Sequence, residues 1–448
     1  MQSLFNTSRR RSYNKIFNLI LFSSKTIFPL ICLNYSIAAT LPPTKNILPN
    51  ISYINLNTIS TINKIEDDFD QFNTSKVGKV LRLQQQLNLN IPLSKANFWG
   101  THNSYNTKVW RYPAPNQKHH INEQLRMGAQ FIELDVHYMR FFAWEKYDTY
   151  VCHGTGPDLH LGCVLGALRL EDTLFQIKQF LENLVYKNQT LILYLEDNAY
   201  KGGHSDIFHE LKNILGEYIY PSGGCTSIPD TLTPKQILDA GKRIIIWKDN
   251  DCAKDSDLKS IVFSSLGNIH RKYEQRAGCI NCTNFTAPQI AQMIEGSNTG
   301  QSPANIIALD LIHPGAEDIP ALLWSWHYPS GEPRNTSPEL DCAVQTSNPN
   351  PYYRGGSWKA MNCDKYYYAA CQNINSGIWA ISYEKTPFSS AERLCQHTFG
   401  KAYNFSTPSN AQENLKLTEM RKHNENIWIN ISDSAQEGNW IVPHEGEY

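Results

Sequence analysis

Five short segments of the sequence place histidine, carboxylate and amide side chains beside runs of apolar residues. They read THNSY at 101–105, ELD at 133–135, CHG at 152–154, LEDN at 195–198 and LD at 309–310. Carboxylate and amide oxygens are the ligands that a hard cation such as Ca²⁺ prefers. Two histidines beside such a cation supply the base and the acid that cleavage of a phosphodiester requires. The sequence therefore predicts a calcium-dependent hydrolytic site, provided that the fold brings these segments together.

Three carboxylates and one amide are the candidate metal ligands. Glu133 and Asp135 are two residues apart in a predicted strand, so their side chains lie on the same face. Neighbouring carboxylates repel each other and have raised pKa values unless a cation joins them. Glu196 adds a third carboxylate, and Asn103 adds an amide oxygen. We expect these four residues to hold Ca²⁺.

Elements that could position these side chains follow from the apolar pattern. Helical periodicity at 171–184 and 205–218 alternates with six apolar runs that predict buried strands. The predicted strands are Asn97–Thr101, Phe131–Val136, Tyr147–Cys152, Thr190–Leu195, Arg243–Trp247 and Asn305–Leu311. This alternation indicates an α/β fold, a (β/α)8 TIM-type barrel at 96–318. In such a barrel the carboxyl ends of all strands meet at one mouth, where the five segments would come together.

The set THNSY, ELD, CHG and YLEDN closely resembles the catalytic half of calcium-dependent phosphoinositide-specific phospholipase C (PI-PLC) over about residues 96–200. The resemblance implies that His102 stabilises the transferred phosphoryl group and that His153 is a second acid/base. It also implies that the four predicted ligands hold Ca²⁺. Lys248 is assigned to substrate binding, and Asp310 is given a supporting role there. The implied reaction releases diacylglycerol and an inositol (cyclic) phosphate from a phosphatidylinositol-type lipid at a membrane surface.

Two other functions remain open. The same barrel could act on a different lipid head group, although enzymes of the glycerophosphodiester type usually show His-Arg-Gly where this chain has Thr101-His102-Asn103. Alternatively, the chain could be a lectin-like adhesion protein with an inert barrel, and the intact catalytic motifs argue against this. Phe141, Phe142 and Trp144 could form an apolar rim that enters a bilayer, or they could pack beneath the connection that follows the second strand.

The region at 319–448 resembles a C-type lectin-like domain in two pieces, which makes it a disulfide-braced α+β module. Residues 324–373 resemble a second half and residues 378–442 a first half, so the module is either permuted or incomplete. Such a region would bind a glycan or a protein, or would only pack against the barrel. The sugar-binding motif is altered, because Glu332-Pro333-Arg334 stands where Glu-Pro-Asn is usual.

The cysteines predict a disulfide framework. Of the 11 cysteines, Cys32 falls in the expected signal peptide, and an even number remains. Cys342–Cys363 is implied by the lectin-like pattern, and Cys371–Cys395 follows if the module is permuted. The other predicted pairs are Cys225–Cys252, Cys152–Cys163 and Cys279–Cys282.

Export is predicted by the first 39 residues. Three arginines at 9–11 precede an apolar run at 16–33 and small residues at 36–39, which is typical of a signal peptide. Residues 40–95 are expected to be a linker or N-terminal extension, with a helix at Val77–Leu87. Together with the cysteines, this predicts a secreted or extracytoplasmic protein.

The charge balance gives no sign of a nucleic-acid partner. The 41 basic and 42 acidic residues leave a formal net charge of −1. Nucleic-acid-binding proteins usually show a basic excess or a basic stripe. An anionic substrate must therefore be bound by a local cluster of charge.

Overall fold

The computed structural model describes residues 67–442 except 113, 155–161, 200–202, 249–256, 265–268, 277–281, 297–302, 335, 338 and 423. All of these residues belong to one compact unit. The predicted signal peptide, residues 40–66 of the predicted linker, Cys252 and Cys279 lie outside the described residues. None of the helices that the structure describes combines the length and apolar character needed to cross a bilayer.

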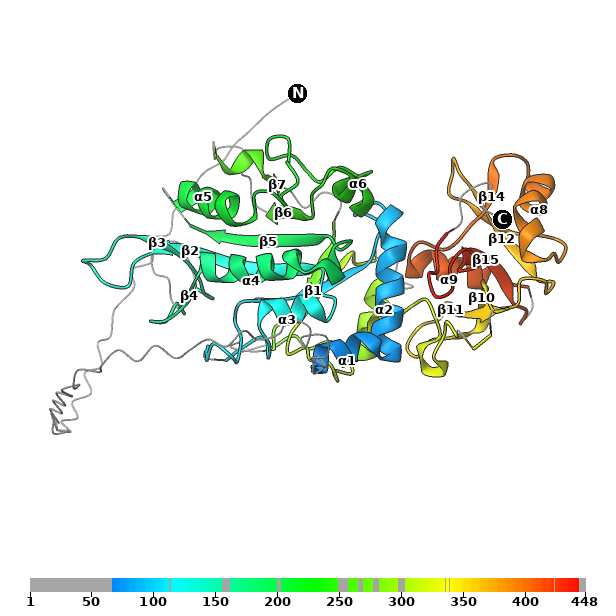
Figure 1. Cartoon of the computed structure of the whole chain (residues 1–448), viewed down its shortest axis with the longest axis horizontal. Coiled ribbons are helices and arrows are strands. Elements are labelled where there is room, and N and C mark those ends of the chain that lie inside the picture. The colour runs from blue at the N-terminus through cyan, green and yellow to red at the C-terminus, as the bar shows by residue number, and fades with distance from the viewer. Residues whose placement is uncertain are drawn as a thin grey trace, which may run out of the picture. The chain divides into compact units, whose positions relative to one another are not determined.

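A curled, mainly parallel sheet carries the predicted catalytic motifs (Figure 1). Seven of its strands run parallel in the order β7-β6-β5-β2-β1-β9-β8, so the fold is the predicted α/β type, with the sheet curled into a half-barrel. These strands are β1 (Phe98–Thr101), β2 (Phe131–Met139), β5 (Leu191–Asn198), β6 (Ile244–Lys248), β7 (Val262–Ser264), β8 (Arg271–Tyr273) and β9 (Ile306–Leu309).

The two faces of this sheet are buried in different surroundings. One cluster of apolar side chains fills the concave inner face and includes Phe131, Tyr194 and Trp247. The alternate residues, such as Leu134 and Leu193, belong to a second cluster that also contains side chains of the covering helices. Burial on both faces explains why the strands read as continuous apolar runs in the sequence.

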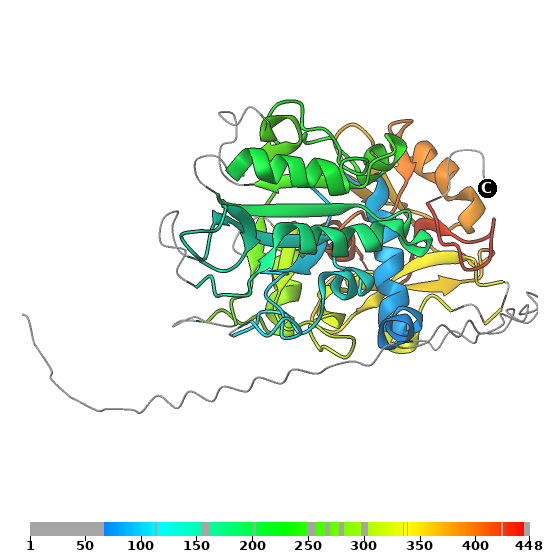
Figure 2. The ribbon, with the colours of Figure 1, turned by 60° about the vertical axis from the view of Figure 1, so that its left-hand side comes forward.

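Helices cover the outer face, as the sequence predicted (Figure 2). They include α4 (Leu170–Glu182) and α5 (Gly203–Leu215), which correspond to the two predicted helices. Three further helices lie between strands of this sheet in the sequence: α3 (Ile121–Arg126), α6 (Pro234–Asp239) and α7 (Ala287–Glu295).

The prediction of a parallel barrel strand at Tyr147–Cys152 is wrong. β3 (Asp148–Val151) pairs antiparallel with β2 and continues to the short strand β4 (Leu168–Arg169). A parallel connection needs a dozen or more residues, usually including a helix, and only residues 140–147 separate β2 from β3. The chain therefore turns back as a hairpin, and the end of β3 returns toward the middle of β2.

Two helices precede the sheet, α1 (Asp68–Thr74) and α2 (Lys76–Leu87), and the second confirms the helix predicted at 77–87. The side chain of Ser75 caps α2 by accepting a hydrogen bond from the backbone N–H of Gly78. Gln84 in α2 donates to the carbonyl oxygen of Leu322 and accepts from the N–H of Trp324. This buried amide fastens α2 to the segment that leads into the C-terminal region.

The C-terminal region forms a second, six-stranded sheet with the order β11-β10-β15-β12-β13 and β14 paired to β12. Its elements are β10 (Cys342–Pro349), β11 (Gly356–Met361), β12 (Tyr368–Asn373), β13 (Trp379–Ile381), α8 (Ala391–Phe399), β14 (Tyr403–Phe405), α9 (Ala411–Glu419) and β15 (Ile427–Ser432). Because β15 pairs with both β10 and β12, strands from the two predicted lectin-like pieces share one sheet.

Three predicted disulfides are confirmed. They are Cys152–Cys163 in the first half and Cys342–Cys363 and Cys371–Cys395 in the second. Cys225 and Cys282 are also disulfide-bonded, and the partners predicted for them lie outside the described residues.

Candidate active site

The strand register brings most of the predicted site residues to one end of the parallel sheet. Thr101 of β1 lies beside Leu309 of β9, so the next residues, His102 and Asp310, are also neighbours. In the same way, Asp135 of β2 lies beside Glu196 of β5. These residues lie at or just beyond the carboxyl ends of their strands, where parallel α/β folds place their active sites.

Three carboxylates form the centre of the cluster. One oxygen each of Glu133, Asp135 and Glu196 lies within 4.8 Å of the other two. Glu133 and Asp135 are buried, whereas Glu196 is exposed at the mouth. Burial raises the pKa of Glu133. Glu196 is exposed as a residue, but its carboxyl group is partly shielded from water, and this shielding together with the charges of Asp135 and Glu133 raises its pKa to about 7. The cluster therefore favours any group that brings positive charge to it.

The amide of Asn103, the fourth predicted Ca²⁺ ligand, lies beside Asp135. One terminal atom of this amide lies 2.9 and 3.1 Å from the two carboxylate oxygens of Asp135. Nitrogen at this position donates two hydrogen bonds to Asp135, whereas oxygen there makes sense only with a cation between the groups. The Oε2 atom of Glu133 is also buried and has no hydrogen-bond partner among the residues that the structure describes. The donor types and their crowding thus suit a hard cation.

A cation that the sequence reasoning missed also reaches this cluster. The guanidinium of Arg271, in β8, pairs with the carboxylate of Glu133. It lies over the rings of Tyr194 and Tyr273, 4.2 and 4.9 Å from their centroids. No strand was predicted at 271–273, but the alternation of Arg271 and Tyr273 was the available signal that both face inward.

His102 is held by a buried carboxylate. Its Nδ1 lies 3.2 Å from Oδ1 of Asp310, which is fully buried. Oδ2 of Asp310 accepts hydrogen bonds from the side chain of Asn116 and from the backbone N–H of Arg276, both at 2.8 Å. Burial lowers the pKa of His102, but the hydrogen bond to Asp310 and the nearby carboxylates outweigh burial and raise it. Asp310 therefore orients His102. The sequence had assigned Asp310 only a supporting role in substrate binding.

His153 reaches the cluster from the β3 hairpin. Its Nδ1 lies 3.2 Å from Oδ2 of Asp135, and its side chain is 54% exposed. The hydrogen bond to Asp135 raises the pKa of His153 more than burial lowers it. The buried hydroxyl of Tyr105 donates to the same Asp135 oxygen at 2.9 Å. Both predicted catalytic histidines thus approach the same group of carboxylates.

Lys248 is not brought to this cluster. Because Tyr194 lies beside Trp247, Lys248 falls on the alternate, outer face of the sheet. Its Nζ donates to Oδ2 of Asp197 at 2.6 Å, and both side chains are buried. Its predicted role in substrate binding thus finds no support in the register.

Comparison with known proteins found a family model, a curated relative and solved structures that are similar to this chain. Residues 65–271 match a family model described as the Rv2075c PI-PLC-like domain. The chain is 25% identical over 411 residues to the uncharacterized protein Rv2075c of Mycobacterium tuberculosis, covering 80% of each protein. Among solved structures, phosphatidylinositol-specific phospholipase C of Listeria monocytogenes matches at 15% identity with a TM-score of 0.31, covering 52% of this chain and 95% of the other. A Staphylococcus aureus enzyme of the same name, in its F249X mutant, matches at 15% identity with a TM-score of 0.37, covering 55% of this chain and 97% of the other.

The hydrogen bond between His102 and Asp310 leads to a prediction. In Asp310→Asn the pKa of His102 should fall, because burial remains while the carboxylate charge is lost. NMR titration of the histidine ring checks this, and phosphodiesterase activity should fall by roughly 10²-fold. Asp318→Asn, which removes a carboxylate that pairs with Arg276, is the control and should leave the pKa of His102 close to its value in the unmutated protein. An unchanged His102 pKa in Asp310→Asn would refute the assignment.

The disulfide beside His153 leads to a second prediction. Cys152 directly precedes His153, and its N–H donates to the backbone carbonyl of Asp135. Replacing Cys152 and Cys163 together by Ser should lower activity by at least about tenfold, because His153 loses its anchor. The matched control replaces Cys342 and Cys363, which brace the C-terminal sheet, and should lower the melting temperature while the folded protein keeps its turnover. Equal turnover of both variants, measured below both melting temperatures, would show that the first bridge does not position His153.

Proposed function

We propose that the PI-PLC-like catalytic domain that this chain carries hydrolyses the phosphodiester bond of phosphatidylinositol-type lipids. The observation that carries the proposal is the meeting of His102 and His153 at one cluster of carboxylates, at the carboxyl ends of β1, β2 and β5. Two proton-transferring groups beside concentrated charge are what this chemistry requires. The matched PI-PLC-like model over 65–271 supports the same class of enzyme.

The proposed reaction has two steps. In the first, the inositol 2-hydroxyl attacks phosphorus, the bond from phosphorus to the diacylglycerol oxygen breaks, and a cyclic phosphodiester forms. A carboxylate of the cluster takes the hydroxyl proton, and His153 gives a proton to the departing diacylglycerol oxygen. In the second step water attacks phosphorus and the bond from phosphorus to the 2-oxygen breaks, which opens the ring. His153 takes a proton from the water, and the protonated carboxyl group gives its proton to the 2-oxygen, so both groups return to their starting states.

Positive charge is the other requirement, because negative charge develops on the phosphoryl oxygens. His102, kept protonated to higher pH by Asp310, and the guanidinium of Arg271 are two side chains that bring positive charge to the cluster. Ca²⁺ would be held by Asn103, Glu133, Asp135 and Glu196. When bound, it would lower the pKa of the attacking hydroxyl and neutralise the phosphate.

A phospholipid surface is the proposed partner, and the tip of the β2–β3 hairpin is the proposed contact. Phe142 and Trp144 stack there with an interplanar angle of 9°, and Trp144 is 81% exposed. Phe141 instead packs against Tyr150 of β3, so only part of the predicted rim is free to meet a bilayer. Exposed aromatic rings suit the membrane interface. A secreted enzyme would meet such lipids outside the cell that made it.

A glycan or protein ligand for the lectin-like region remains a proposal with less support. Glu332, in the altered sugar motif, is buried. Its carboxylate accepts hydrogen bonds from Arg334 and from the N–H of Ala360. These bonds use the carboxylate internally, and they favour a structural role for this motif.

The calcium-dependent hydrolysis is tested with the purified chain and phosphatidylinositol vesicles, by measuring water-soluble inositol phosphate. His102→Ala and His153→Ala should each reduce release by roughly 10²-fold or more. Chelation of Ca²⁺ should abolish release, and Asp135→Asn should raise the Ca²⁺ concentration needed. Full activity in chelator would refute the calcium requirement and leave Arg271 as the charge that replaces it. Absence of release from any phosphodiester lipid would refute the enzyme proposal.

The membrane contact is tested separately from the chemistry. Trp144→Ala should lower cleavage of vesicle-bound lipid by about tenfold, because aromatic burial at the interface is lost. Cleavage of a short-chain, water-soluble phosphatidylinositol should stay unchanged. Tyr383→Ala, at a 72% exposed site in the C-terminal half, is the control. A parallel loss on both substrates would place Trp144 in folding or catalysis and not in membrane contact.

A further inference from the structure

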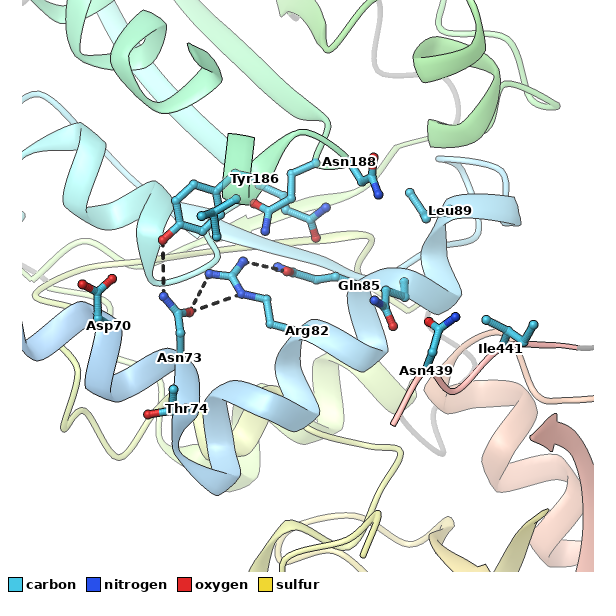
Figure 3. Close-up of a pocket in the computed structure, with 14 residues that line it drawn as sticks. Asp70, Asn73, Thr74, Arg82, Gln85, Leu89, Tyr186, Asn188, Asn439 and Ile441 are labelled. Atoms are coloured by element: carbon cyan, nitrogen blue, oxygen red, sulfur yellow. Dashed lines mark hydrogen bonds between the residues drawn. The ribbon is translucent and has the colours of Figure 1, made fainter. Parts of the chain in front are cut away.

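A cavity of about 770 Å³ lies at the end of the parallel sheet where β2 and β5 begin (Figure 3). Gln130 and Gln189, which line it, precede the first residues of β2 and β5, whereas the catalytic residues lie toward the carboxyl ends of these strands. The remaining walls come from α1, α2, the residues after α4, and Asn439 and Ile441. A cavity of this volume is large enough for a small ligand.

One cation, Arg82 of α2, dominates the chemistry of this cavity. Its Nε and Nη2 donate to Oδ1 of Asn73, its Nη2 also donates to the backbone carbonyl of Arg126, and its Nη1 donates to Oε1 of Gln85. Figure 3 shows the guanidinium between Asn73 and Gln85. All of these acceptors are neutral, and a guanidinium has five N–H groups. One N–H of Nη1 therefore has no acceptor among the described residues.

The positive charge of Arg82 has no acidic partner in the part of the chain that the structure describes. The cavity lining holds one acid, Asp70, and its carboxylate pairs with Arg126 at 3.1 Å, beside Asp67. A charge withdrawn from water is costly unless an opposite charge meets it. Burial accordingly lowers the pKa of Arg82 to about 10. An anion entering the cavity would supply the missing charge and accept the unused N–H.

The rest of the lining is rich in neutral hydrogen-bonding groups. Oε1 of Gln189 is buried and accepts no hydrogen bond from the described part of the chain. Gln86, Asn188 and Asn439 also line the cavity. Amide groups both donate and accept, which matches hydroxyl groups better than it matches a bare ion.

We propose that this cavity is a second binding site, which takes a small anion that carries hydroxyl groups, of the class of sugar phosphates and sugar carboxylates. Arg82 binds the anionic group, and the surrounding amides bind the hydroxyls. The site does not depend on the proposed phosphodiesterase activity, because it shares no residue with the carboxylate cluster.

Binding is tested on the full chain by isothermal titration calorimetry with glucose 6-phosphate, glucuronate, glucose and inorganic phosphate. At least one of the two charged sugars should bind about tenfold or more tightly than both glucose and inorganic phosphate. Glucose 6-phosphate and glucuronate distinguish a phosphate from a carboxylate as the anionic group. No binding of either charged sugar, or equal binding of glucose, would overturn the proposal, as would inorganic phosphate binding as tightly as the better charged sugar.

A variant pair places the site without disturbing the core. Val185 lines the cavity and is 79% exposed, so Val185→Glu adds a carboxylate that competes with the ligand for Arg82. Leu184→Glu adds the same charge at an adjacent, 80% exposed position that does not line the cavity. Val185→Glu should weaken binding by about tenfold or more, and Leu184→Glu by less than about twofold. Binding that Val185→Glu leaves unchanged, or that both variants weaken equally, would locate the ligand elsewhere and overturn the proposal.

Discussion

The burial of two carboxylates on the inner face of one strand is the constraint on which this structure depends. Glu133 and Asp135 project from β2 into a space where unpaired charge is expensive. The groups that pair with or donate hydrogen bonds to these carboxylates come from distant parts of the chain. They are Arg271 from β8, Tyr105 from the segment after β1, and His153 from the β3 hairpin. A curled sheet is needed because only curvature brings the edge strand β8 within reach of β2.

The periodicity of the sequence predicted that Glu133 and Asp135 share one face of a strand, but it did not predict the direction of β3. The two-residue spacing of Glu133 and Asp135 in an apolar run is enough to place both on one face. Glu196 lies near the end of the next parallel strand, β5, and the observed register places it beside Asp135. The direction of β3 was predicted wrongly because an apolar run says nothing about which way its neighbour runs. The short connection between β2 and β3 would have indicated that the two strands are antiparallel.

Arg271 and Lys248 show that an apolar pattern alone does not identify the residues of the site. Lys248 ends an apolar strand and looked like a substrate ligand, but the alternation of faces turns it toward Asp197 on the outside. Arg271 lies in a strand of three residues, of which two are charged, so no apolar pattern marks it. Its contact with Glu133 depends on the completed sheet and cannot be predicted from the local sequence. The cysteine pairs of the C-terminal sheet were easier, because a resemblance in residue order was enough to assign them.

The sequence distance between His102 and its partner has a consequence for how the protein is made. Asp310 is 208 residues further along the chain, and Arg271 is 138 residues beyond Glu133. Domains generally fold as units during synthesis, from the N-terminus onward. A growing chain that has exposed all four segments from THNSY to LEDN still lacks the last four parallel strands, β6 to β9, and with them both partners. The cluster around His102 and Glu133 is therefore complete only after the end of the sheet has emerged, and a chain that ends before β8 lacks both of these partners.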